Sequence, residues 1–131
     1  MDSAFNQVVA SYHRARQSGE LFDTLYQVFL GKSPEIPPMF ARTDFPHQKL
    51  MLRESLLEML IFAQTGAGRV EIERLAVRHR GLNVKPAHYD LWLDALCEAL
   101  AKHDRVFNST LEQMWRDAMR KGIEVMSAGA S

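Results

Sequence analysis

The chain of 131 residues carries 16 basic and 16 acidic side chains, so no net charge draws it toward nucleic acid or an anionic membrane. Its composition, 47% hydrophobic and 24% charged, is that of a soluble globular protein with a sizeable core. The single cysteine, Cys97, excludes an internal disulfide framework and any multi-cysteine metal site. No signal peptide or membrane-spanning stretch is visible, and we expect one cytoplasmic domain over residues 1–131.

Apolar residues recur at three- and four-residue spacing along most of the chain, which predicts helices. The expected helices are 3–17, 21–30, 44–65, 70–79, 86–102 and 109–126. Three prolines between Pro34 and Pro38 allow at most a turn or two of helix before Phe40. No stretch alternates at period two. We therefore predict an all-α fold of six or seven unequal helices in orthogonal packing around an interior pocket, with a frayed tail at 127–131.

Residues 75–89, LAVRHRGLNVKPAHY, place a histidine at the end of a helix. His79 shares one helix face with the apolar residues that precede it, Gly81 follows as a stop signal, and Pro86 suits the first turn of the next helix. Such an imidazole can hold one strong ligand over a flat cofactor. From this stretch alone, the alternative is a packed and hydrogen-bonded core histidine.

Further residues are candidates for the walls of the same pocket. Tyr26 belongs to the second helix, and Phe40 follows the proline corner. Gln48 and Leu52 are four residues apart and therefore point the same way. An iron porphyrin requires one imidazole on the metal, an apolar slot, and a few hydrogen-bond donors on the opposite side for bound dioxygen.

With these motifs in this order, the chain resembles the globin family, most closely bacterial single-domain globins and the haem domains of flavohaemoglobins. The matching stretches are LYQVFLGKSPEIPPMF, HQKLMLRESL, LAVRHRGLNVKPAHY and a late Trp115. The resemblance implies a b-type haem, iron protoporphyrin IX. It also implies reversible binding of dioxygen at ferrous iron, and of nitric oxide or carbon monoxide.

The resemblance assigns a role to each residue that faces the iron. It implies that His79 is the proximal ligand and that Tyr89 supports it. Tyr26 and Gln48 match the distal residues, whose donors stabilise the partial negative charge on bound dioxygen. His47 replaces Gln48 as the distal residue if the helix register differs by one position. We expect the second ring nitrogen of the proximal histidine to bond to a backbone carbonyl one turn earlier, that of Leu75.

Other residues are implied to contact the cofactor. Phe40 matches the phenylalanine on the porphyrin face, Leu52 the apolar residue one turn after Gln48, and Val84 belongs to the same pocket. Arg78 and Lys85 flank the site, and they either pair with the haem propionates or are solvated surface charges.

The sequence also departs from the flavohaemoglobin pattern. The connection between Phe40 and Gln48 is shorter. The last helix lacks the acidic residue that completes a charge network with the proximal histidine, because Glu124, the nearest carboxylate, has the wrong spacing. The remaining histidines, His13, His88 and His103, are expected on polar helix faces.

Three functions remain open from the sequence. The first is reversible oxygen binding, for transport or storage. The second is conversion of nitric oxide to nitrate, which requires an external reductase because no flavin or nicotinamide motif is present. The third is a helical interaction domain that senses gas or works without haem. The oligomeric state is open, and a homodimer is compatible with the sequence.

Overall fold

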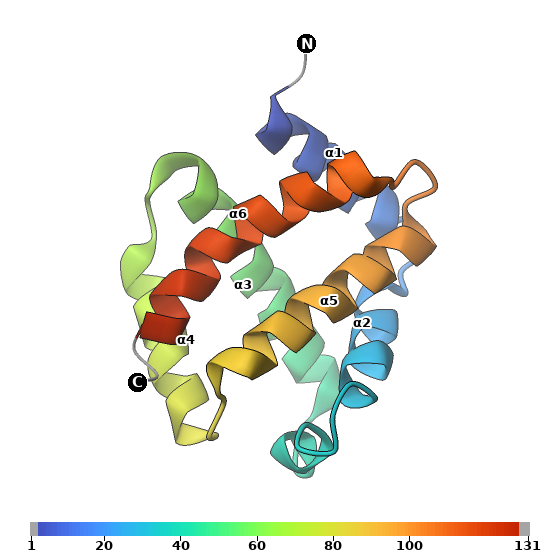
Figure 1. Cartoon of the computed structure of the whole chain (residues 1–131). Coiled ribbons are helices and arrows are strands. Elements are labelled where there is room, and N and C mark those ends of the chain that lie inside the picture. Colours follow the sequence, from blue (N-terminus) through green and yellow to red (C-terminus); the bar gives the residue numbers. More distant parts are fainter. Residues whose placement is uncertain (1–2, 129–131) are drawn as a thin grey trace.

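A computed structural model describes residues 3–128, which form α-helices joined by short corners, with one 3-10 helix (Figure 1). The elements are α1 (Ala4–Arg16), α2 (Leu21–Leu30), η1 (Pro37–Phe40), α3 (Phe45–Thr65), α4 (Arg69–Gly81), α5 (Pro86–His103) and α6 (Ser109–Ala128). No strand occurs in this range, which confirms the predicted all-α fold. Residues 127 and 128 complete α6 instead of fraying, whereas 129–131 lie outside the described residues.

The starts of α1 and α3 are set by side chains that accept hydrogen bonds from otherwise unpaired backbone N–H groups. Ser3 accepts from the Asn6 N–H at 3.1 Å before α1. Asp44 accepts from the His47 N–H at 3.4 Å before α3, whose first turn also contains a proline. Gly66 then ends α3 in the left-handed conformation, with a φ of 75°. Local sequence therefore determines where α3 begins and ends.

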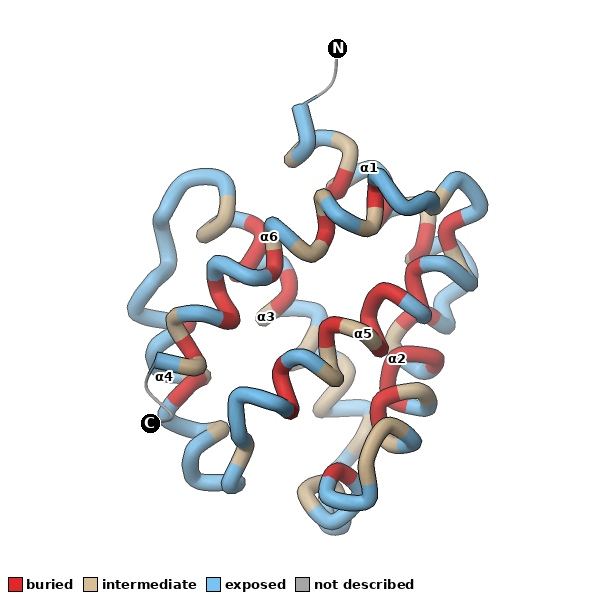
Figure 2. The backbone as a smooth tube through the Cα atoms, viewed as in Figure 1, coloured by how far each residue is buried: buried red, intermediate tan, exposed pale blue. Residues whose placement is uncertain are grey.

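Two neighbouring helices, α5 and α6, run diagonally across the view in Figure 1, and α3 crosses behind them. The most extensive contacts join α2 to α5 and α3 to α6. Gly122 permits the second of these contacts, because a Cβ atom there would lie 3.1 Å from Cε of Met59. Figure 2 shows the buried residues on the facing sides of the helices. The largest fully buried apolar side chains include Trp115, Tyr12, Leu25, Ile36, Leu96 and Leu100.

A buried polar cluster joins the first helix to the corner between the last two. Asp104 is 1% exposed and accepts hydrogen bonds from Arg14 Nε at 2.6 Å and from Ser11 Oγ at 2.6 Å. Trp115 Nε1 donates to the same Ser11 oxygen at 3.0 Å. Burial raises the pKa of the Asp104 carboxyl, but the bonds from Arg14, Ser11 and the Val106 N–H outweigh it and hold the pKa below its usual value.

The histidines differ from the expectation of polar helix faces. His13 is exposed, but His88 is only 3% exposed. His103 is partly buried and lies between two hydroxyl groups, 2.7 Å from Thr24 Oγ1 and 3.1 Å from Ser18 Oγ. The prediction was wrong for His88 and His103, because segments distant in sequence cover those faces of α5. Within residues 3–128, no helix has the length and apolar character needed to span a bilayer.

Candidate functional site

A cavity of about 200 Å³ opens between two groups of helices. One wall is formed by α2, η1 and α3, and the other by α4, α5 and α6. Most of its lining is apolar, and includes Phe29, Met39, Phe40, Met51, Leu52, Met59, Leu75, Leu82, Val84, Trp92 and Met126. Such a slot suits a largely apolar ligand held by a few polar groups.

His79 lies on one wall of the cavity, in the last turn of α4. Its Nδ1 is 3.0 Å from Tyr89 Oη, so the partner of the imidazole is this phenol and not the predicted Leu75 carbonyl. Burial, and secondarily the charge of Arg78, lower the pKa of His79 to about 4. The ring is therefore neutral at pH 7. In the tautomer that carries its proton on Nδ1, Nε2 keeps a free electron pair for a metal.

The corner after α4 holds the His79 backbone. Its carbonyl oxygen accepts hydrogen bonds from the N–H groups of Leu82 and Val84, both at 3.0 Å. The left-handed residue of this corner is Asn83, with a φ of 62°, and not Gly81, which is still helical. The helix therefore runs two residues past the predicted end, and the corner that follows is hydrogen-bonded to the His79 carbonyl.

Tyr26 and Gln48 lie on the opposite wall. The Tyr26 side chain is 6% exposed; burial raises the pKa of its hydroxyl, and a hydrogen bond with Gln48 partly offsets this. The Tyr26 ring packs edge-on against Phe40 and Phe45, each with centroids 5.6 Å apart. His47 is exposed and does not line the cavity, so the α3 register presents Gln48 there.

The other predicted cofactor contacts divide into two groups. Leu52, Arg78 and Val84 line the cavity together with Tyr89. Lys85 lies outside it, with Nζ 3.9 Å from a carboxylate oxygen of Glu35, and it borders a separate surface hollow.

Glu124 lies away from the cavity, whereas His88 lines it. Glu124 lines a different hollow, and α6 contributes Met126 to the cavity instead. Sequence reasoning did not place His88 at the cavity, because nothing local in the sequence signals that a distant loop covers that side of α5.

Comparison with known proteins identifies the fold. A solved structure from Pseudomonas aeruginosa, described as structurally highly homologous to a human hemoglobin, matches with a TM-score of 0.93 and 37% sequence identity. The match covers 98% of this chain and 99% of the other. The chain belongs to the globin family. The globin family model also matches residues 62–126 of this globin, and no curated protein sequence matches it.

The cavity can be tested for its fit to haem, the usual cofactor of globins. The neutral imidazole of His79 is held on one wall by the hydrogen bond between its Nδ1 and Tyr89, which leaves Nε2 for a metal. Apolar and aromatic side chains line the space beside it, and two hydrogen-bonding side chains lie on the far wall. Each of these features is one that a flat iron porphyrin with a gas ligand requires. The residues of this globin therefore fit haem.

Proposed function

We propose that this globin binds b-type haem through His79 and reversibly binds dioxygen, with nitric oxide or carbon monoxide as further ligands. The proposal rests on the polar groups that face each other across the cavity. A neutral histidine bonded to Tyr89 lies on one side of an apolar cavity, and the Tyr26–Gln48 pair lies on the other. This function groups it with bacterial single-domain globins and flavohaemoglobin haem domains, as the sequence resemblance implies.

On the proximal side, the chain supplies an electron pair and holds it in place. Nε2 of His79 would ligate the iron, and haem when bound would supply the position at which a gas binds. Tyr89 restricts rotation of the imidazole through Nδ1. Because burial raises the pKa of the Tyr89 hydroxyl, the phenol stays protonated and is a weaker acceptor than a carboxylate.

The Tyr89 hydroxyl, as a weak acceptor, helps to distinguish an oxygen-binding globin from a catalytic one. A carboxylate on Nδ1 would make the imidazole more electron-donating, which favours peroxidase-like chemistry. In this globin the partner is a neutral phenol. We therefore favour reversible binding over nitric oxide dioxygenation, which would also require electrons from an external reductase.

On the distal side, the chain supplies two hydrogen-bond donors in a pocket with a mostly apolar lining. The Tyr26 hydroxyl and the Gln48 amide can both donate to a gas ligand that carries partial negative charge. Each bond contributes about 1 to 1.5 kcal/mol. Two such donors slow the release of dioxygen, and the aromatic packing around Tyr26 keeps its hydroxyl in position.

Absorption spectra of the ferric, ferrous and carbonyl forms test the proposal. The wild-type protein should take up haem and show a strong Soret band in all three states. His79→Ala should lose haem or show a markedly altered band, whereas His47→Ala, which changes an exposed histidine, should leave the spectra unchanged. A wild-type protein that takes up no haem would contradict the proposal and favour a haem-independent interaction domain.

A further inference from the structure

The loop before η1 is joined to the first turn of α5 by a buried histidine. His88 Nε2 lies 2.8 Å from Oε2 of Glu35, and His88 Nδ1 lies 3.0 Å from the backbone N of Lys85. Since Nδ1 accepts from the Lys85 N–H, the neutral ring carries its proton on Nε2 and donates it to Glu35. His88 is 3% exposed and the Glu35 side chain is 57% exposed, so the bond connects the interior to the surface.

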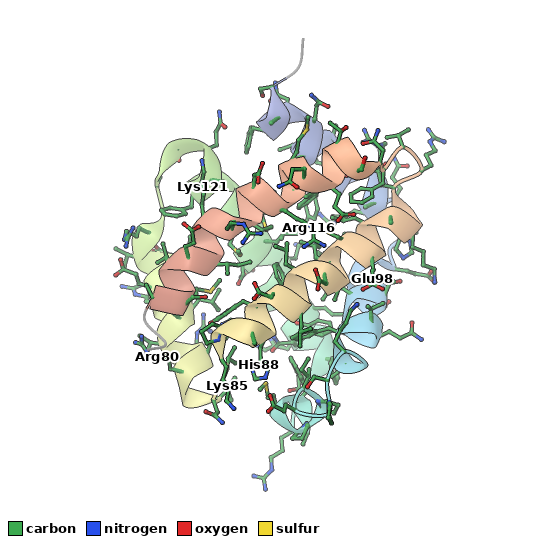
Figure 3. The ribbon with its side chains drawn as sticks, in the orientation of Figure 1. Arg80, Lys85, His88, Glu98, Arg116 and Lys121 are labelled. Carbon is green, nitrogen blue, oxygen red and sulfur yellow. The ribbon has the colours of Figure 1, made fainter. Side chains whose placement is uncertain are left out.

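This bond lies at a boundary of the cavity. His88, Met39 and Leu82 line the cavity and also the surface hollow that contains Glu35 and Lys85. They therefore form the partition between the cavity and solvent. Figure 3 shows His88 and Lys85 together at the start of α5, on the side nearest η1.

The two ends of the bond belong to opposite walls. Glu35 lies two residues before η1, whose Phe40 packs on the Tyr26 ring of the distal wall. His88 directly precedes Tyr89, which is bonded to His79 on the proximal wall. Glu35 and His88 are 53 positions apart in sequence, so this contact, and not the local chain, holds the walls together at this point.

We propose that Glu35 and His88 form a clamp that closes this side of the cavity and retains the cofactor. The inference rests on the proposed binding of haem. The hydrogen bonds of His88 go to Glu35 and Lys85, whereas His79 is bonded to Tyr89, so loss of the clamp changes how fast the cavity opens and leaves the axial ligand in place. The exposed Glu35 carboxylate on the buried His88 imidazole suits this role, because water can take the place of the carboxylate when the segment before η1 moves away.

The test compares Glu35→Ala with Glu54→Ala, which removes an exposed carboxylate from α3. Haem loss is followed by transfer of haem to an excess of a scavenging apoglobin. Amide hydrogen exchange of residues 33–40 is measured on the same proteins without haem. We expect Glu35→Ala to lose haem about fivefold faster or more, and to exchange faster in residues 33–40, while Glu54→Ala matches wild type on both measurements.

The two measurements separate this inference from the proposed function. Unchanged exchange in residues 33–40 of Glu35→Ala would overturn the clamp whether or not haem binds. Faster exchange with an unchanged rate of haem loss would also overturn it, because the bond would then hold only the segment. If the wild-type protein takes up no haem, both the proposed function and the proposed retention of haem fail. The hydrogen-exchange data then report only on the Glu35–His88 bond.

Discussion

At the scale of single residues, the site depends on how each polar group is partnered. His79 is neutral because it is buried, and its Nδ1 is engaged by Tyr89. Gln48 lies beside Tyr26 and partly offsets the rise in the pKa of its hydroxyl, so both polar groups face the cavity before any ligand arrives. Preorganised donors of this kind stabilise a polar ligand without first giving up bonds to water.

The distal donors predict how fast dioxygen leaves. Replacing Tyr26 by Phe removes one hydroxyl and keeps the ring, so the aromatic contacts with Phe40 and Phe45 are preserved. Loss of one hydrogen bond of 1 to 1.5 kcal/mol corresponds to dissociation about tenfold faster. Stopped-flow displacement of dioxygen by carbon monoxide measures this rate. A His47→Ala control should be unchanged, and an unchanged rate in Tyr26→Phe would argue against a donor role for the hydroxyl.

At the scale of the elements, the crossing of α3 and α6 depends on one small residue. A Cβ at Gly122 would lie within 3.2 Å of two Met59 atoms, whereas a Cβ at Gly81 would meet nothing within 4 Å. Both glycines are helical and neither has a positive φ. Substitution of Gly122 therefore reports on helix packing, whereas substitution of Gly81 reports on helix propensity alone.

We expect Gly122→Leu to destabilise the protein by about 1 to 3 kcal/mol, because the larger side chain forces α6 away from α3. Gly81→Leu is the matched control and should cost nothing or be slightly stabilising, since it improves helix propensity without a clash. Urea unfolding followed by circular dichroism gives both free energies. Equal effects of the two substitutions would show that α3 and α6 do not require the close approach.

At the scale of the whole molecule, the Asp104 cluster links the start of the chain to its end. Asp104 follows α5, Arg14 and Ser11 belong to α1, and Trp115 belongs to α6. The carboxylate is buried, and its charge is balanced by one arginine that is itself only 29% exposed. Loss of either charge leaves the other poorly solvated, so the pair matters to the assembly of all three helices.

The cluster predicts a loss of stability in acid. The pKa of Asp104 is lower in the folded protein than in the unfolded chain. Its stabilisation is therefore complete above the unfolded pKa, about 4, and is lost as the pH falls through the folded pKa.

Asp104→Asn should cost about 1.5 to 3 kcal/mol at pH 7 and should flatten the decline between pH 4 and pH 2. Urea unfolding across that pH range measures the free energy of unfolding. The control is Asp90→Asn, which changes an exposed aspartate on α5. A decline of the same steepness in Asp104→Asn would exclude this carboxyl as its source.

The sequence by itself determined the helices and part of the cavity lining. Helix bounds follow from periodicity and from local caps such as Asp44 and Gly66, which act within a few residues. The spacing and order of His79, Tyr26 and Gln48 are visible in the chain, and the resemblance to globins implies the role of each.

Only the tertiary structure decided the partners of the polar groups. The Nδ1 of His79 could have bonded to the Leu75 carbonyl or to Tyr89, and the way the corner after α4 sets the first turn of α5 brings the phenol within 3.0 Å of it. His88 is buried because the loop carrying Glu35 folds over it, and Lys85 faces that loop instead of the cavity. A hydrogen bond between distant residues depends on how the helices pack together, and no local pattern in the sequence encodes that packing.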